Sequence, residues 1–234
     1  MTDETALEPI RWTTWLGGFA RLLCLPVVFI WPSGDWGWPQ GWALAGVWVA
    51  YSVFMGLWLA KNDPELLRSR LDARPAQEGQ ASWDKVLMIA MLITGLALIA
   101  VPPLDHRWGW STVPTWLEIA GLLANIPAFV FVSWVMMKNT FLARVVKIDA
   151  ERGHTVITDG PYAIVRHPMY LGVLLAVFAT PLALGSWWGL IPAAAMNAAL
   201  VVRTVLEDRM LHEELDGYRE YAQQTRYRLV PGVF

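Results

Sequence analysis

Several uncharged runs in the chain are long enough to cross a lipid bilayer as helices. Residues 40–60 and 86–104 comprise 21 and 19 positions without a charged side chain, and the run from Pro168 to Val202 comprises 35. About 20 apolar residues at 1.5 Å rise per residue span the ~30 Å hydrocarbon core of a bilayer. Charged residues make up 16% of the chain, against about 25% in a soluble domain. We therefore expect an all-α, multi-pass transmembrane helical bundle.

Six segments are apolar enough to be membrane spans. They cover residues 14–31, 40–60, 85–104, 114–137, 168–185 and 188–208. A single helix through the last uncharged run would extend about 52 Å, which is too long for one span. The sequence GSWWG at residues 185–189 offers turn residues and a tryptophan pair that suits a membrane interface. The last two spans are therefore predicted to form a tight helical hairpin, and one long kinked helix is the alternative.

The loops differ sharply in positive charge, which predicts the orientation of the chain. Lysine and arginine gather in residues 61–83, 138–167 and 203–228, and they are almost absent from the other connections. The positive-inside rule places these regions, both termini and any site built from them in the cytoplasm. In a bacterial cell the membrane would be the cytoplasmic one. The opposite connections are flanked by tryptophans, most of which are expected to form an outer aromatic belt, namely Trp31, Trp36, Trp38, Trp42, Trp108, Trp110, Trp116, Trp187 and Trp188.

Several kinds of site are not indicated by the sequence. It contains no G-x-G-x-x-G or P-loop motif, and no serine-centred nucleophile elbow. The only cysteine is Cys24, and the four histidines are scattered without a metal-binding spacing. We expect no metal site, no intrachain disulfide and no nucleic-acid partner. A nucleotide-like cofactor would need another architecture.

The sequence GHTVITDGPYAIVRHPMYLG, residues 153–172, is the most distinctive polar stretch. Gly160 can adopt a positive φ and Pro161 fixes its own φ, so the TDGP sequence predicts a turn. Pro168 suits the first position of a helix, which would place His167 at a helix N-terminus, a favourable site for anions. The alternative is a membrane-interface anchor made of basic and aromatic residues.

The end of the last span carries a second polar motif, VVRTVLEDRMLHEEL at residues 201–215. Arg203 and Glu207 are four residues apart, so they share a helix face. Ionisable residues that face a bundle interior mark functional sites, whereas a snorkelling arginine beside a solvated glutamate would not. The spacing leaves both interpretations open. Residues 217–234, GYREYAQQTRYRLVPGVF, predict a turn, a short amphipathic segment and a basic tail at the membrane surface.

These three blocks, over roughly residues 147–231, resemble the isoprenylcysteine carboxyl methyltransferase family and the related phospholipid methyltransferases. The resemblance implies an S-adenosylmethionine (SAM) site between the cytoplasmic ends of the last helices, with S-adenosylhomocysteine as product. It makes Arg203 the substrate contact, and Arg203 and Glu207 the candidate catalytic residues. The implied cofactor contacts are Lys147, His154, Thr155, Val156, Ile157, Tyr162, His167, Pro168, Met169, Tyr170 and Glu207.

The resemblance implies methyl transfer to a lipophilic acceptor, most simply the carboxylate of an isoprenylcysteine-like substrate that enters from the bilayer. Residues 1–137 would supply the first four helices and residues 138–234 the catalytic region of one structural domain. A phospholipid amine N-methyltransferase or a thiol S-methyltransferase is the alternative within this class. An NADPH-dependent sterol-type membrane reductase and a small transporter or scaffold are the alternatives from other classes.

Overall fold

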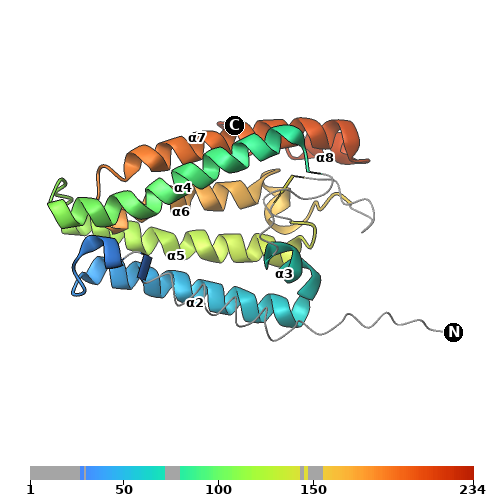
Figure 1. Cartoon of the computed structure of the whole chain (residues 1–234). Coiled ribbons are helices and arrows are strands. Elements are labelled where there is room, and N and C mark those ends of the chain that lie inside the picture. Colours follow the sequence, from blue (N-terminus) through green and yellow to red (C-terminus); the bar gives the residue numbers. More distant parts are fainter. Residues whose placement is uncertain (1–26, 29, 72–79, 143–144, 147–154) are drawn as a thin grey trace.

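The computed structural model describes residues 27–28, 30–71, 80–142, 145–146 and 155–234, and the regular elements in them are helices. The longer ones lie side by side (Figure 1), which confirms the predicted all-α bundle. The helices are α2 (Pro39–Asn62), α3 (Pro64–Leu71), α4 (Ser82–Trp108), α5 (Thr115–Lys138), the 3₁₀ helix η2 (Gly160–Ala163), α6 (Pro168–Ala183), α7 (Leu190–Glu214) and α8 (Tyr218–Gln224).

Four of these helices are long and apolar enough to cross a membrane, namely α2, α4, α5 and α7. They correspond to four of the six predicted spans. The predicted span at 168–185 is the shorter apolar helix α6, whose 16 residues extend only about 24 Å. The predicted span at 14–31 lies largely outside the described residues. Because α6 is much shorter than the 25-residue α7, its first residues lie beside the interior of α7.

The final uncharged run forms a hairpin, as predicted, and the alternative of one kinked helix is wrong. Helix α6 ends at Ala183 and α7 begins at Leu190. Gly185 between them has a φ of +71°, a conformation that glycine adopts without steric strain. Pro181 remains inside α6. The hairpin brings the beginning of α6 and the end of α7 to the same end of the bundle.

Close helix packing fixes the hairpin against the rest of the bundle. A Cβ atom on Gly121 of α5 would lie 2.6 Å from the backbone nitrogen of Ala183 and 2.9 Å from the carbonyl oxygen of Ala179. Small residues at helix contacts are the usual way for membrane helices to approach closely. Helix α7 packs against both α4 and α6.

The tryptophans support most of the predicted aromatic belt. At the end opposite α3 and α8, Trp31, Trp36, Trp108, Trp110, Trp116, Trp187 and Trp188 are exposed, as membrane-interface residues are. Trp38 is an exception, because it is buried and stacks on His106 with ring centroids 4.6 Å apart. Trp38 is therefore not among the residues that form the belt.

A short helix begins at Pro64 and is labelled α3. The sequence DPELLRSRL predicts it, because proline suits a first helical turn. The Asp63 carboxylate accepts a hydrogen bond from the backbone N–H of Leu66 at 2.9 Å, which satisfies one of the unpaired donors in the first turn. Helix α3 lies at the same end of the bundle as α8 (Figure 1).

Candidate functional site

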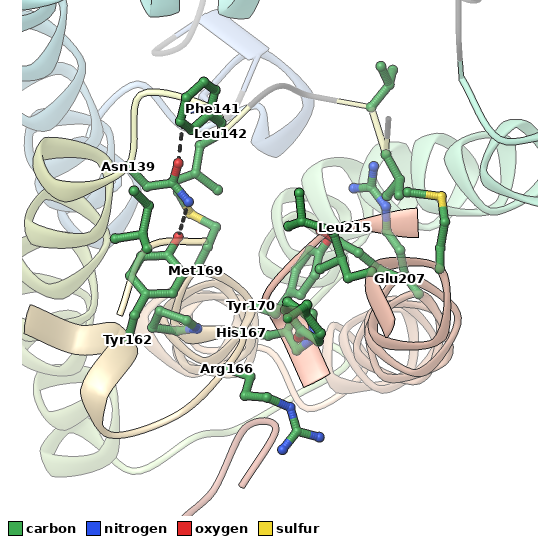
Figure 2. Close-up of a pocket in the computed structure, with 18 of the residues that line it drawn as sticks. Asn139, Phe141, Leu142, Tyr162, Arg166, His167, Met169, Tyr170, Glu207 and Leu215 are labelled. Carbon is green, nitrogen blue, oxygen red and sulfur yellow. Dashed lines mark hydrogen bonds between the residues drawn. The ribbon is translucent and has the colours of Figure 1, made fainter. Parts of the chain in front are cut away.

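A cavity of about 320 Å³ lies where α4, α6 and α7 meet the segments between α5 and α6. Figure 2 shows the side chains around it. Its polar lining comes from Asn139, Thr155, Tyr162, Arg166, His167, Tyr170, Arg203, Glu207 and Tyr218, with Arg70 from α3. Its apolar lining includes Met88 and Met91 of α4, Val173 of α6 and Leu200 of α7. The cavity thus joins polar groups at the end of the bundle to apolar walls supplied by its long helices.

Tyr162 reaches the cavity because the chain folds locally as the TDGP sequence predicts. Gly160 has a φ of +61° and opens the 3₁₀ helix η2, which buries the Tyr162 ring. Asn139 at the end of α5 donates its amide N–H to the Tyr162 hydroxyl at 2.8 Å, and its carbonyl accepts from the backbone N–H of Phe141 (Figure 2). Burial raises the pKa of the Tyr162 hydroxyl, so it stays a neutral hydrogen-bonding group.

Tyr170 of α6 connects the two charged residues of α7. Its hydroxyl donates a short hydrogen bond to the Glu207 carboxylate. The guanidinium carbon of Arg203 lies 5.7 Å from the centroid of the Tyr170 ring, within the range of a cation–π contact. The i to i+4 spacing of Arg203 and Glu207 therefore does place both at one cavity, where Tyr170 lies between them.

Arg203 is buried, and its partner comes from a helix that the sequence motifs do not include. Its Nε–H donates to Oδ1 of Asp84 at 2.8 Å and its Nη2 donates to Oδ2 at 3.3 Å. Arg203 is 6% exposed and Asp84 is fully buried in the first turn of α4. The interpretation of Arg203 as a snorkelling residue is therefore wrong.

Asp208, next to Glu207, contacts four side chains, two from the turn before α6 and two from the chain after α7. Its carboxylate accepts from Arg166 at 2.8 and 3.1 Å, from Tyr218 at 2.9 Å and from Arg228 at 2.8 Å. Nε2 of His167 lies 3.2 Å from the same carboxylate. Arg166 and His167 are buried, so the alternative of a membrane-interface anchor is wrong. Figure 2 shows Arg166 pointing away from the other labelled side chains.

The C-terminal segment packs onto this cluster through its backbone, and most of its side chains after Thr225 remain exposed. The backbone N–H groups of Arg166 and His167 donate to the carbonyls of Tyr227 and Arg228, each at 2.9 Å. Gly217, with a φ of +81°, makes the predicted turn into α8. The tail thus uses the backbone N–H of His167, which the sequence had suggested as part of an anion site.

The structure brings ten of the twelve predicted site residues to the lining of this one cavity. They are Thr155, Val156, Ile157, Tyr162, His167, Pro168, Met169, Tyr170, Arg203 and Glu207. The other two, Lys147 and His154, lie outside the described residues. In the part of the chain that the structure describes, histidine, cysteine, aspartate and glutamate form no group of three that could hold a metal ion.

Sequence reasoning missed Asp84, Asn139 and Asp208. Asp84 had a detectable signal, because a carboxylate at the edge of an uncharged run is costly to bury without a partner. For Asp208, the sequence offers no signal beyond its position next to Glu207. Asn139 gave no signal, because an asparagine after a helix is usual there.

Comparisons with known proteins match the part of the chain that contains most of the cavity-lining residues. The phospholipid methyltransferase family model matches residues 116–216. Protein-S-isoprenylcysteine O-methyltransferase B of Arabidopsis thaliana is 29% identical over 153 residues, which cover 61% of this chain and 72% of that protein. Protein-S-isoprenylcysteine O-methyltransferase of Schizosaccharomyces pombe is 23% identical over 209 residues, which cover 76% of this chain and 84% of that protein.

A bacterial relative has a different kind of name. The cobalt-zinc-cadmium resistance protein CzcN of Cupriavidus metallidurans is 32% identical over 124 residues, 51% of each chain. The family match and the two methyltransferases favour the methyltransferase interpretation over the reductase and over the transporter or scaffold. The chain is therefore a membrane methyltransferase related to the isoprenylcysteine and phospholipid methyltransferases.

Proposed function

We propose that the protein transfers a methyl group from SAM to the carboxylate of a lipophilic, isoprenylcysteine-like acceptor. The observation that carries this proposal is the composition of the cavity at the start of α6. Glu207, Tyr170 and Arg203 supply charge and hydrogen bonds, and Met88 and Met91 add apolar surface to the same lining. A water-soluble donor and a membrane-borne acceptor need such a boundary site.

The residues present fit a SAM molecule. The cavity volume of about 320 Å³ falls in the lower part of the range for small-molecule sites, about 300–1,000 Å³. The Glu207 carboxylate suits an ammonium or ribose hydroxyl group, and the tyrosine rings of the cavity suit a cationic sulfonium. When bound, SAM supplies an electrophilic methyl group on its sulfonium sulfur. Lys147 and His154 complete the cofactor contacts that we propose.

Arg203 is the group that we assign to the acceptor carboxylate. A carboxylate is ionised at neutral pH, so the protein needs to orient and desolvate it and needs no general base. Arginine binds carboxylates through paired N–H donors, and Leu200 lies one helical turn from Arg203 in the same lining. We also infer that this end of the bundle faces the cytoplasm, because it carries Lys61, Arg68, Lys138, Arg226 and Arg228.

A second candidate acceptor is a phospholipid amine, and one observation favours it. Asp84 already compensates the charge of Arg203, and Glu207 adds another carboxylate to the cavity. An amine acceptor must lose a proton before or during methyl transfer, and Glu207 is placed to receive it. The family model that matches residues 116–216 is named for phospholipid methyltransferases.

The test is transfer of labelled methyl from SAM to a panel of lipophilic acids, amines and thiols, with the protein in lipid nanodiscs. Arg203→Ala and Glu207→Ala are expected to abolish most turnover. Arg209→Ala and Glu214→Ala change exposed residues of the same helix and serve as matched controls. Full turnover by both site variants would contradict the assigned site, and absence of transfer to every acceptor would contradict the proposed function.

A further inference from the structure

Asp84 is a buried carboxylate in the half of the chain that the family match does not cover. The match begins at residue 116, whereas Asp84 lies in the first turn of α4 and is fully buried. An isolated carboxylate is very costly to remove from water, so a buried one needs a charged partner and further hydrogen bonds. Asp84 has both, and its charged partner is the cavity residue Arg203.

The hydrogen bonds to Asp84 fix its carboxylate from three segments of the chain. Arg203 of α7 donates through Nε and Nη2, the Gln80 amide donates at 2.9 Å, and the backbone N–H of Val146 donates at 3.0 Å. The carbonyl of Val146 in turn accepts from the backbone N–H of Ala81 at 3.2 Å. Because the carboxylate is immobilised in this way, the bidentate contact also fixes the plane of the Arg203 guanidinium.

The Arg203 guanidinium also contacts other residues that line the cavity. Arg203 lies over the ring of Tyr170, and the Tyr170 hydroxyl donates to Glu207. Arg203 therefore contacts the same side chain that is hydrogen-bonded to Glu207. The ion pair of Asp84 and Arg203 is thus in direct contact with residues that line the cavity. The contacts run from α4 through α7 to α6, along one side of the cavity.

We propose that Asp84 is a positioning residue, which orients the Arg203 guanidinium toward the acceptor and offsets its positive charge. This inference rests on the proposed function, because it assigns a role to Arg203 in acceptor binding. The acceptor carboxylate then meets an arginine whose orientation is fixed and whose charge is partly balanced. Such balance permits release of the neutral ester product and keeps an unfilled cavity free of an uncompensated buried cation.

Asp84→Asn should change acceptor affinity and kcat in opposite ways, because it removes both the charge balance and the bidentate contact. The variant keeps the shape of the side chain but leaves the Arg203 charge uncompensated, so the affinity for an anionic acceptor is expected to rise about tenfold. The guanidinium also loses its bidentate contact, and a loosely oriented group is expected to lower kcat about 10- to 100-fold. The KM for SAM is expected to stay unchanged, because Glu207 and the tyrosines keep their places.

The experiment uses the full chain in nanodiscs with an N-acetylated S-farnesylcysteine and its carboxamide as paired probes. Kinetics and equilibrium binding are measured for the parent, Asp84→Asn, Arg203→Gln and the double variant, with exposed Lys85→Gln as the control. We expect Asp84→Asn to increase the preference for the acid over the amide, and Arg203→Gln to remove it. The double variant should behave like Arg203→Gln, because Asp84 acts through Arg203.

The proposal is overturned if Asp84→Asn keeps the parental kcat and acid preference. It is also overturned if the reduction of kcat in the double variant equals the product of the reductions in the two single variants. If Asp84→Asn does not fold, Asp84→Glu decides, because it keeps the charge but displaces the guanidinium. A lower kcat with unchanged KM for SAM supports the proposal, and parental kinetics overturn it. If the parent methylates no acceptor, the proposed function fails, and the acid preference in binding still tests the role of Asp84.

Discussion

The Arg166 guanidinium and the Asp208 carboxylate form a two-point ion pair, with Nε–Oδ1 and Nη2–Oδ2 distances of 2.8 and 3.1 Å. Both residues are buried. Nη1 of Arg166 also donates to the carbonyls of Thr225 and Arg226, each at 2.8 Å. The pair therefore holds the turn before α6, the last long helix and the C-terminal segment together. Basic residues at this end of the protein, such as Arg166, therefore also stabilise the structure around the cavity.

Asp208→Asn should be strongly destabilising, because it leaves a buried guanidinium without its carboxylate. Breaking one side of a buried ion pair typically lowers the free energy of unfolding by about 3–5 kcal/mol. Chemical or thermal unfolding in detergent measures this loss. Asp216→Asn, which changes an exposed aspartate on the following turn, is the matched control. Equal stability of the two variants would contradict the structural role of Asp208.

The buried tyrosines outside the spans should make the protein lose stability in alkali. Burial raises the pKa of the hydroxyls of Tyr162, Tyr218 and Tyr221. The unfolded chain releases these protons near pH 10 while the folded protein keeps them, so stability is fully present below pH 10 and falls above it. Each tyrosine contributes a fall of about 1.4 kcal/mol per pH unit in that range.

Tyr218→Phe tests this alkaline effect directly. Unfolding free energies measured between pH 8 and pH 11 should show a slope above pH 10 that is smaller by about 1.4 kcal/mol per pH unit than in the parent. The variant also loses the hydrogen bond to Asp208, so its stability is lower at every pH. The slope is therefore the informative quantity, and identical slopes would show that Tyr218 ionises in the folded state.

The sequence was sufficient for the features that depend on local chain chemistry. Uncharged runs predicted the long helices, and Gly185, Gly160 and Pro168 lie at the predicted breaks because backbone preferences at those residues are strong. The i to i+4 spacing predicted that Arg203 and Glu207 share a helix face, and both line one cavity. The length of α6 was not predictable, since hydropathy does not report where a helix gives way to an apolar turn.

Partner identity across the bundle was beyond the sequence. Arg203 pairs with Asp84, 119 positions away, and Arg166 pairs with Asp208, 42 positions away. Neither spacing follows from a local repeat. The first pair depends on how α4 packs against α7, and the second depends on how the α6–α7 hairpin brings α7 back to the turn before α6. Charge patterns indicated that polar groups gather at one end of the protein, but they could not separate groups that line the cavity, such as Glu207, from those outside its lining, such as Asp208.

Asn139→Ala should weaken cofactor binding without disturbing the fold. The variant removes the N–H donor that holds the Tyr162 hydroxyl, and the loss of one such hydrogen bond of about 1 kcal/mol corresponds to roughly a fivefold rise in the dissociation constant for SAM. Binding of SAM to the purified protein measures the effect. Asn62→Ala changes an asparagine at the end of α2 that bonds only its own helix. A similar rise in both variants would contradict this role for Asn139.

Gly121→Ala should separate α5 from α6 and thereby destabilise the protein. The added Cβ would lie within 3 Å of the α6 backbone at Ala183 and Ala179, and backbone cannot rotate away as a side chain does. Such overpacking typically lowers the free energy of unfolding by about 1–3 kcal/mol. Gly46→Ala is the matched control, because a Cβ there meets nothing within 4 Å. The control should be neutral or stabilising by up to about 1 kcal/mol, since alanine is the better helix former. If both variants instead unfold at the parental midpoint, the close contact of α5 with α6 does not contribute to stability.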